Sequence, residues 1–428
     1  MPLAKPYRDW AESHCVVVSG LCIFLTHKKI ENINMSNTKH LAQRIQNLQP
    51  SAIRELLKHS KMPGVISLAG GIPSSELFDK QGLELATRKV LEENFNDAFQ
   101  YGLTEGNSEL RDQLVELCKA RGITTRSDQL LITSGSQQAL DLLIRALADE
   151  GDVFVVERPT YLATLQILSL TAAKVESVGG DEHGMIVDEL EALLKTTRVK
   201  GVYLVPTFGN PSGTTLSAER REKLVKLAAE HDFVIIEDDP YGAISFTDRR
   251  EKTLIQVAKE LGYEDHVVYT STFSKILAPG LRVGWIILPE WMKQKVAIIK
   301  QATDLHANSF TQALAAAYLK LGRLDQQIEL IREAYKQKCL TLSRLLEDEL
   351  GEHITFNQPQ GGMFLWASFR YDFDTTAWLQ KTLEKGVVYV PGEFFFSDHA
   401  DKRTLRFSYA TATDEQLVEA VKRLKAAL

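Results

Sequence analysis

The stretch VYLVPTFGNPSGTTLSAERREKLVKLAAEHDFVIIEDDPYG, residues 202–242, decides the fold class of this chain. Two short apolar runs, Val202–Pro206 and Phe233–Glu237, flank a helix-length segment, SAERREKLVKLAAEH. Continuously apolar strands that alternate with helices are typical of a parallel sheet covered on both faces. The stretch therefore predicts a strand–helix–strand unit of an α/β protein.

The same alternation continues on both sides of that unit. Helix-length stretches such as QQALDLLIRALAD separate further β-rich runs. We expect seven strands in one mostly parallel sheet covered by helices, namely Gln129–Thr133, Val153–Val156, Ala173–Val178, Val202–Pro206, Phe233–Glu237, Val267–Ser271 and Val283–Leu288. Ligands of such sheets bind at the carboxyl ends of the strands, so the residues that follow these runs are candidates for a site.

The last quarter of the chain predicts a second, smaller α+β domain. A long helical segment, LDQQIELIREAYKQKCLTLSRLLEDEL, precedes strand-like pieces around GGMFLWASF and TLRFSYA. We expect a large domain over residues 81–325, a small one over 326–428, and a segment over 35–80 that joins the small domain to the site. Residues 1–34 contain an apolar run, CVVVSGLCIFLT, that is shorter than a membrane-spanning helix. We interpret residues 1–34 as an upstream extension, with the native chain starting near Met35.

Composition argues against several classes of function. The chain has 428 residues, a formal net charge of −6 and 44% hydrophobic residues, which is typical of a soluble globular protein. Mild acidity argues against nucleic-acid or membrane binding, because phosphate groups are bound by concentrated basic surfaces. The four cysteines form no Cys-x-x-Cys pair and the histidines form no His-Glu-x-x-His pattern. We therefore expect a reducing cytoplasmic environment and no metal site.

A lysine stands among hydroxyl groups in YTSTFSKILAPGLRVGW, residues 269–285. Thr272 and Ser274 lie just before Lys275, and Arg282 follows seven residues after it. Most lysines are exposed to solvent, so a polar turn with one exposed lysine is the simpler interpretation. The alternative is a reactive amine beside a cluster of phosphate-binding donors.

The segment SGSQ, residues 134–137, follows the apolar run LLIT and opens a helical stretch. Backbone N–H groups at the start of a helix, together with its dipole, favour an anion such as phosphate. Serine is also an ordinary helix cap, so this signal is weak alone. Combined with Arg282 and the hydroxyl groups upstream of it, the segment predicts a phosphate site.

Polar residues also follow two other strands. Asn210 precedes a proline in TFGNPSG and is typical of a turn. Glu237, Asp238 and Asp239 follow the apolar run FVII, and each acid alone is typical of a solvated loop. Three carboxylates together need a positive partner, and the protonated ring nitrogen of a cofactor would provide one.

Six segments, in order and spacing, resemble one protein family: SLAGGIPSSELF, YGLTEGNSELR, TSGSQQALDL, PTFGNPSGT, EDDPYG and FSKILAPGLRVGW. From Met35 to the C-terminus the chain resembles the pyridoxal-phosphate-dependent aminotransferases of class I/II, which have the aspartate-aminotransferase fold. Within them it is most similar to the 2-aminoadipate/kynurenine aminotransferase-like branch. One departure is NPSG where Asn-Pro-Thr-Gly is usual, and serine keeps a small hydroxyl group there.

The resemblance implies three catalytic residues. Lys275 would form the Schiff base with the cofactor and then move a proton at the substrate Cα, which requires a lowered lysine pKa. Asp238 would pair with the pyridine nitrogen, because it lies three residues before Tyr241, although the two neighbouring carboxylates remain rivals. Tyr241, the third catalytic residue, would hydrogen-bond the phenolic oxygen of the cofactor, and the binding residue Asn210 would hydrogen-bond the same oxygen.

The resemblance also implies two sets of binding residues. Those for pyridoxal 5′-phosphate are Ser134, Gly135, Ser136, Gln137, Tyr161, Asn210, Asp238, Tyr241, Thr272, Ser274, Lys275, Arg282, and Tyr101 from the neighbouring subunit. Those for the substrate are Arg406, Asn210, Gly70 and Gly71. Arg406 would clamp the α-carboxylate, whereas Tyr161 would stack on the ring, with a packed core tyrosine as the alternative. A tyrosine donated by a neighbour implies a homodimer with shared active sites.

The function implied by the resemblance is transfer of an amino group from an L-amino acid to a 2-oxo acid. The donor would be of the 2-aminoadipate, aromatic or branched aliphatic type, the acceptor 2-oxoglutarate, and the carrier a pyridoxamine phosphate intermediate. A lyase or decarboxylase on the same fold is an alternative, because fold alone does not fix function. A regulator-type domain is a weaker one, since the residues before Met35 lack a basic recognition helix.

Overall fold

The computed structural model describes residues 40–42, 45, 56, 59, 62–248 and 251–428. The chain divides into two compact units, Met1–Leu48 and Gln49–Leu428, and all features below belong to the second. The interpretation of residues 1–34 as an upstream extension, and of Met35 as the native start, falls outside the described residues.

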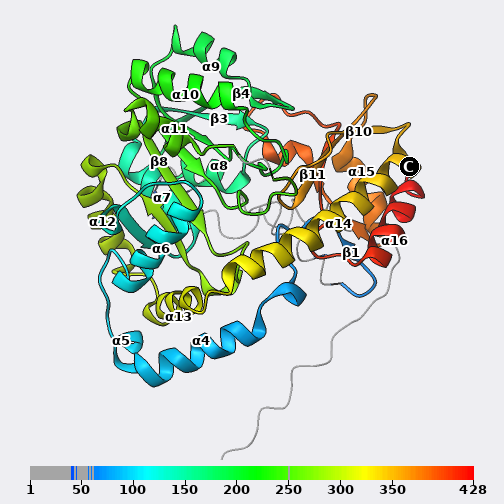
Figure 1. Cartoon of the computed structure of the whole chain (residues 1–428). Coiled ribbons are helices and arrows are strands. Elements are labelled where there is room, and N and C mark those ends of the chain that lie inside the picture. Colours follow the sequence, from blue (N-terminus) through cyan, green and yellow to red (C-terminus); the bar gives the residue numbers. More distant parts are fainter. Residues whose placement is uncertain (1–39, 43–44, 46–55, 57–58, 60–61, 249–250) are drawn as a thin grey trace, which may run out of the picture. The chain divides into compact units, whose positions relative to one another are not determined.

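An eight-stranded sheet forms the centre of this unit (Figure 1). Its strands, in spatial order, are β2 (Leu130–Thr133), β9 (Gly284–Ile287), β8 (Val267–Thr272), β7 (Val234–Asp238), β6 (Val199–Leu204), β3 (Val153–Arg158), β4 (Lys174–Asp181) and β5 (Gly184–Met185). Neighbouring strands from β8 to β4 pair in parallel, whereas β9 and β5 run antiparallel to their neighbours. The predicted α/β class with a mostly parallel sheet is confirmed.

The prediction of seven strands missed the short edge strand β5. This strand has two residues and pairs with the end of β4 in a hairpin, in which Gly184 has a φ of +81°. A Cβ at Gly184 would lie 2.9 Å from the Cα of Leu216. A strand this short has no apolar run for a sequence pattern to detect.

Helices cover the sheet in groups. Helix α7 packs against α8 and α12, and α10 packs against α9 and α11, while α13 packs against α4, α5 and α6 (Figure 1). Their bounds are α4 Lys80–Glu93, α5 Phe95–Phe99, α6 Ser108–Ala120, α7 Ser136–Leu147, α8 Leu162–Ser169, α9 Val187–Leu194, α10 Ala218–His231, α11 Leu254–Leu261, α12 Glu290–Asp304 and α13 Ser309–Lys320. All residues of β7 and β8 are buried, which explains their continuously apolar sequences.

The C-terminal part has a second, antiparallel sheet. Its strands are β10 (Ile354–Phe356), β11 (Phe364–Phe369), β14 (Thr404–Ser408) and β13 (Val390–Pro391), and its helices are α14 (Leu324–Leu350), α15 (Thr375–Glu384) and α16 (Asp414–Lys425). Helix α14 coincides with the long helical segment expected from the sequence. Within the described residues, no helix has the length and apolar character needed to cross a membrane.

The N-terminal segment contributes β1 (Ile66–Ser67), which pairs in parallel with β12 (Val387–Val388) in a separate two-stranded sheet. The backbone N–H of Leu68 donates to the Val388 carbonyl, and that of Ser408 donates to the Leu68 carbonyl, both over 2.7 Å. These bonds fix the residues that follow Leu68 beside strand β14.

Candidate functional site

The ends of β6, β7 and β8 lie side by side, and each carries one of the predicted residues. Asn210 follows β6, Asp238 ends β7, and Lys275 follows β8. Because these three strands are parallel neighbours, their carboxyl ends meet at one edge of the sheet. The sheet therefore gathers residues from three separate motifs.

Asp238 differs from both neighbouring carboxylates in having an oxygen without a hydrogen-bond partner. Its Oδ2 accepts from the Tyr203 hydroxyl over 3.1 Å, whereas its buried Oδ1 accepts from no described group. Glu237 accepts from two backbone N–H groups at the start of α11 and lies 3.8 Å from Arg221. Asp239 accepts from a buried tyrosine hydroxyl and a backbone N–H. Of the three rivals, only Asp238 has a buried oxygen without a hydrogen-bond partner among the described residues.

Burial raises the pKa of Asp238 to about 7. The Tyr203 hydrogen bond lowers this pKa, the charge of Asp239 raises it, and the charge of Lys275 lowers it. A buried carboxylate without a full set of partners is costly in an apolar environment. A cationic donor placed against Oδ1 would remove that cost.

Lys275 lies half-buried and points toward the N-terminal segment. Its Nζ donates to the Gly71 carbonyl over 2.8 Å and lies 6.0 Å from the centre of the Tyr241 ring. Burial, together with the charges of Arg406 and Arg282, lowers the pKa of Lys275 to about 8. A neutral amine is the nucleophilic form of lysine, and the lowered pKa increases the neutral fraction of Lys275 near neutral pH.

The start of α7 and the side chain of Arg282 form an anion cradle. Gly135 precedes α7 with a φ of +87°, and a Cβ added there would lie 2.5 Å from Arg282 Nη2. Arg282 Nη2 donates to the Ser134 carbonyl over 2.9 Å. The buried Ser136 Oγ has no partner among the described residues. The first turn of α7 thus offers an uncommitted hydroxyl and backbone N–H groups beside a guanidinium.

Three further residues were predicted to bind the phosphate: Thr272 and Ser274, which precede Arg282 in the chain, and Gln137, which follows Ser136. The hydroxyl groups of Thr272 and Ser274 are 2.9 Å apart, and the Ser274 N–H donates to Thr272 Oγ1 over 3.1 Å. Both side chains are buried at the end of β8, just before Lys275. Gln137 lies exposed in the first turn of α7.

Arg406 on β14 is buried and held from several sides. Its Nη1 donates to Asn210 Oδ1 and its Nη2 donates to the Ala69 carbonyl, both over 2.6 Å. The rings of Phe364 and Phe395 lie 4.2 and 4.9 Å from the guanidinium carbon. Its Nε is buried without a partner among the described residues. Burial lowers the pKa of Arg406 to about 10, so the side chain remains charged at neutral pH.

Three other predicted site residues are Gly70, Tyr161 and Tyr101. Gly70 is buried directly after Ala69, and Tyr161 lies half-buried just before α8. Tyr101 is 79% exposed, and the one ring contact it makes among the described residues is an edge-to-face contact with His306. Tyr101 therefore depends on a second chain for the role that was expected of it.

Sequence reasoning missed Tyr203 and the two aromatic rings beside Arg406. Tyr203 lies in the apolar run VYLVP, and a tyrosine buried in such a strand needs a partner for its hydroxyl group. That requirement was the available signal, although the identity of the partner depends on strand register.

Three buried polar atoms in the described site lack partners: Asp238 Oδ1, Ser136 Oγ and Arg406 Nε. They match, respectively, a cationic ring nitrogen, a phosphate and a carboxylate. The donor set is therefore compatible with pyridoxal 5′-phosphate and an amino-acid carboxylate. Among the residues that the structure describes, no group of three or more histidines, cysteines or acids could hold a metal ion.

Comparisons with known proteins agree with this arrangement. Residues 64–424 match the family described as "Aminotransferase class I and II". The chain is 40% identical to aromatic-amino-acid aminotransferase 1 of Thermococcus litoralis, over 93% of this chain and 96% of that protein. It is 37% identical to 2-aminoadipate transaminase of Thermus thermophilus, over 89% and 94% of the two chains. The solved kynurenine aminotransferase of Pyrococcus horikoshii, in complex with PMP, KYN and KYA, superimposes with a TM-score of 0.86 at 38% identity, covering 91% of this chain and 96% of that one.

Proposed function

Because this chain belongs to the class I and II aminotransferases and uses pyridoxal 5′-phosphate, we propose that its donor is an amino acid of the 2-aminoadipate, aromatic or branched aliphatic type. The proposed acceptor is 2-oxoglutarate. The names of the relatives support the aromatic and 2-aminoadipate types, since they include aromatic amino acids, 2-aminoadipate and kynurenine. The chain transfers amino groups, and the proposal concerns which ones.

The observation that carries the site assignment is the pairing of a reactive lysine with an incompletely satisfied aspartate. When bound, pyridoxal 5′-phosphate supplies an electron sink for the negative charge that develops at the substrate Cα. Asp238 would keep the ring nitrogen protonated through its unpartnered Oδ1. Lys275 would move the proton at the substrate Cα, as its lowered pKa allows.

The remaining residues would bind and orient. Arg406 would hold the substrate α-carboxylate, because a guanidinium offers donors in a fixed planar arrangement. Ser136 and Arg282 would bind the cofactor phosphate at the start of α7. Burial raises the pKa of Tyr241 well above its usual value, so its hydroxyl stays protonated and can donate to the phenolic oxygen.

We also propose a homodimer with shared active sites. Four large apolar side chains in and after α5 are exposed: Phe95 by 55%, Phe99 by 61%, Tyr101 by 79% and Leu103 by 62%. A cluster of exposed apolar residues is typical of a protein–protein interface. In the proposed dimer these residues pack against the second chain, and Tyr101 reaches the partner's phosphate.

The proposed organisation places the cofactor domain over residues 81–325, the small domain over 326–428 and the connecting segment over 35–80. The hydrogen bonds of Leu68 with the C-terminal strands support that connecting role. A cytoplasmic location is proposed as well, since Cys118 and Cys339 are buried free thiols.

A panel of amino acids tests the proposed donor and acceptor. Purified protein with pyridoxal 5′-phosphate is incubated with each L-amino acid, with and without 2-oxoglutarate, and glutamate is measured. Glutamate should form with 2-aminoadipate, aromatic or branched aliphatic donors only when 2-oxoglutarate is present. Consumption of the amino acid without an added oxo acid, with release of ammonia or carbon dioxide, would instead indicate a lyase or decarboxylase.

A further inference from the structure

Two buried tyrosines on the strands beside β7 donate to consecutive carboxylates. The Tyr203 hydroxyl on β6 donates to Asp238 Oδ2 over 3.1 Å. The Tyr269 hydroxyl on β8 donates to Asp239 Oδ2 over 2.9 Å. Both tyrosines are fully buried. The two pairs therefore match in donor, acceptor and burial.

Strand register directs the two pairs to opposite faces of the sheet. Tyr203 pairs across from Ile236, and Tyr269 pairs across from Glu237. Side chains alternate between the faces along a strand. Tyr203 consequently shares a face with Ile236 and Asp238, while Tyr269 lies on the face of Glu237.

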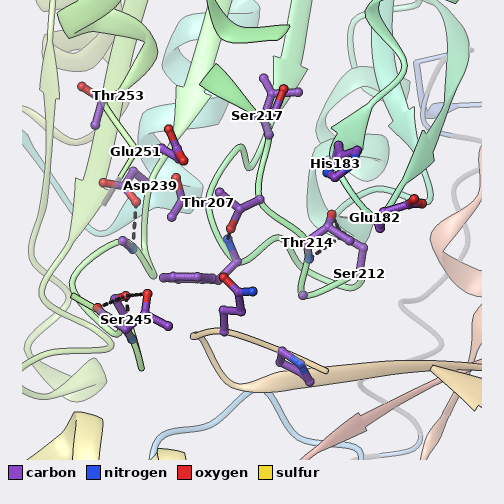
Figure 2. Close-up of a pocket in the computed structure, with 18 of the residues that line it drawn as sticks. Glu182, His183, Thr207, Ser212, Thr214, Ser217, Asp239, Ser245, Glu251 and Thr253 are labelled. Carbon is purple, nitrogen blue, oxygen red and sulfur yellow. Dashed lines mark hydrogen bonds between the residues drawn. The ribbon is translucent and has the colours of Figure 1, made fainter. Parts of the chain in front are cut away.

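The two carboxylates also have different surroundings. Asp239 has both oxygens engaged and lines a cavity of about 570 Å³ together with Thr207 and Gly242. Figure 2 shows Asp239 facing this cavity, with a dashed line to a backbone nitrogen. Asp238 is not among the residues that line this cavity, and its Oδ1 has no partner among the described groups. Only the first pair ends in a carboxylate with a buried oxygen that has no partner among the described residues.

We propose that Tyr203 is a positioning residue that holds Asp238 ionised, so that the proton between Asp238 Oδ1 and the cofactor's ring nitrogen stays on the nitrogen. This inference rests on the proposed function. Without the Tyr203 hydroxyl, Asp238 Oδ2 would be a buried carboxylate oxygen without its hydrogen-bond donor, which favours the neutral carboxylic acid.

The groups that face Asp238 support this role. Burial and the charge of Asp239 both favour the protonated form of Asp238. Of the groups that favour the ionised form, Tyr203 has a larger effect than Lys275. Tyr241, which lies nearby, stays protonated and adds no charge. The Tyr203 hydroxyl donates directly to Asp238 over 3.1 Å and therefore favours its ionised form.

The test measures the ring nitrogen itself. Holoenzyme is prepared with ¹⁵N-labelled pyridoxal 5′-phosphate, and the ¹⁵N chemical shift is recorded at one neutral pH for the wild type, Tyr203→Phe and Tyr269→Phe. The wild type and Tyr269→Phe should both show the protonated pyridine. Tyr203→Phe should shift toward the neutral pyridine and retain the cofactor about tenfold less tightly. A Tyr203→Phe signal equal to the wild type, or equal shifts in both variants, would overturn the proposal.

A second variant covers the case in which Tyr203→Phe does not fold. Replacing Tyr203 by p-aminophenylalanine keeps the shape of the ring and provides a weaker donor, so a smaller shift in the same direction is expected. No shift in that variant would also overturn the proposal. A wild type that binds no cofactor, or whose ring nitrogen is neutral, contradicts the proposed site instead. The two failures are therefore distinguishable.

Discussion

Arg406 Nη1 donates to Asn210 Oδ1 over 2.6 Å and thereby joins strand β14 to the loop that follows β6. The second terminal nitrogen is held by the Ala69 carbonyl, and two phenylalanine rings lie against the guanidinium. The arginine is therefore fixed in orientation before a substrate binds. Its Nε has no hydrogen-bond partner among the described residues, which is the observation behind the proposed role of Arg406 in binding the substrate carboxylate.

Replacing Arg406 by lysine should weaken binding of both substrates while leaving the cofactor bound. A lysine keeps the charge but loses the planar donor set, so KM for the amino acid and the oxo acid should rise about 10- to 100-fold. Steady-state kinetics and the visible spectrum measure the two effects. Arg403→Lys is the matched control, because Arg403 makes an exposed ion pair with Asp401. Equal kinetics for both variants would contradict the assignment.

Gly135→Ala should weaken cofactor binding through Arg282. The added Cβ would lie 2.5 Å from Arg282 Nη2, which must then move away from the cradle. Gly151 has a similar φ, +85° against +87°, but open space where a Cβ would be. Both alanine variants should lose about 1 kcal/mol of stability from backbone strain. Only Gly135→Ala should also bind pyridoxal 5′-phosphate at least about tenfold more weakly in an equilibrium titration.

Asp238→Asn should stabilise the cofactor-free protein at neutral pH. Burial raises the pKa of Asp238 from 3.8 to about 7, so the unfolded chain releases this proton at lower pH than the folded one. Stability is therefore lost as pH rises from about 4 to about 7, and asparagine removes that loss. At about 1.4 kcal/mol for each pH unit, the gain at pH 7 is at most about 4 kcal/mol.

Asp239→Asn is the control for that stability measurement. Both oxygens of Asp239 accept hydrogen bonds, so an amide NH₂ would face a donor and the variant should be destabilised. Denaturant unfolding of the cofactor-free proteins at pH 5 and pH 7 measures both changes. Stabilisation of neither variant, or of both, would contradict the distinction drawn between the two carboxylates.

The sequence was sufficient to predict most strands of the sheet and the positions of the polar residues at their carboxyl ends. Strands β7 and β8 are wholly buried, so their apolar runs were visible, and Asp238 and Lys275 follow from where those runs end. The partner of Tyr203 could not be predicted, because it depends on the register between β6 and β7. Strand β5 was too short to leave a pattern. Tyr101 is exposed, so the packing of one chain gives it no role.

Mixing Tyr101→Phe with Lys275→Ala should restore activity at limiting cofactor if the sites are shared. Tyr101→Phe is expected to weaken cofactor retention about ten- to hundredfold, because it removes one hydrogen bond to a charged phosphate. In a heterodimer with a Lys275→Ala chain, each shared site combines Lys275 of one chain with Tyr101 of the other. One of the two sites then carries both substitutions and the other carries neither, so activity returns at limiting cofactor. No recovery on mixing, or a monomer by sedimentation, would contradict the shared site.

Borohydride reduction of the holoenzyme, followed by peptide mapping, identifies the lysine that binds the cofactor covalently. We propose Lys275 as the amine that attaches the cofactor, because it follows β8 at the carboxyl ends of the parallel strands and its pKa is lowered to about 8. The reduced cofactor should be found on the peptide that contains Lys275, and Lys275→Ala should carry no covalent adduct. An adduct on another lysine, or an unchanged adduct in Lys275→Ala, would contradict this assignment.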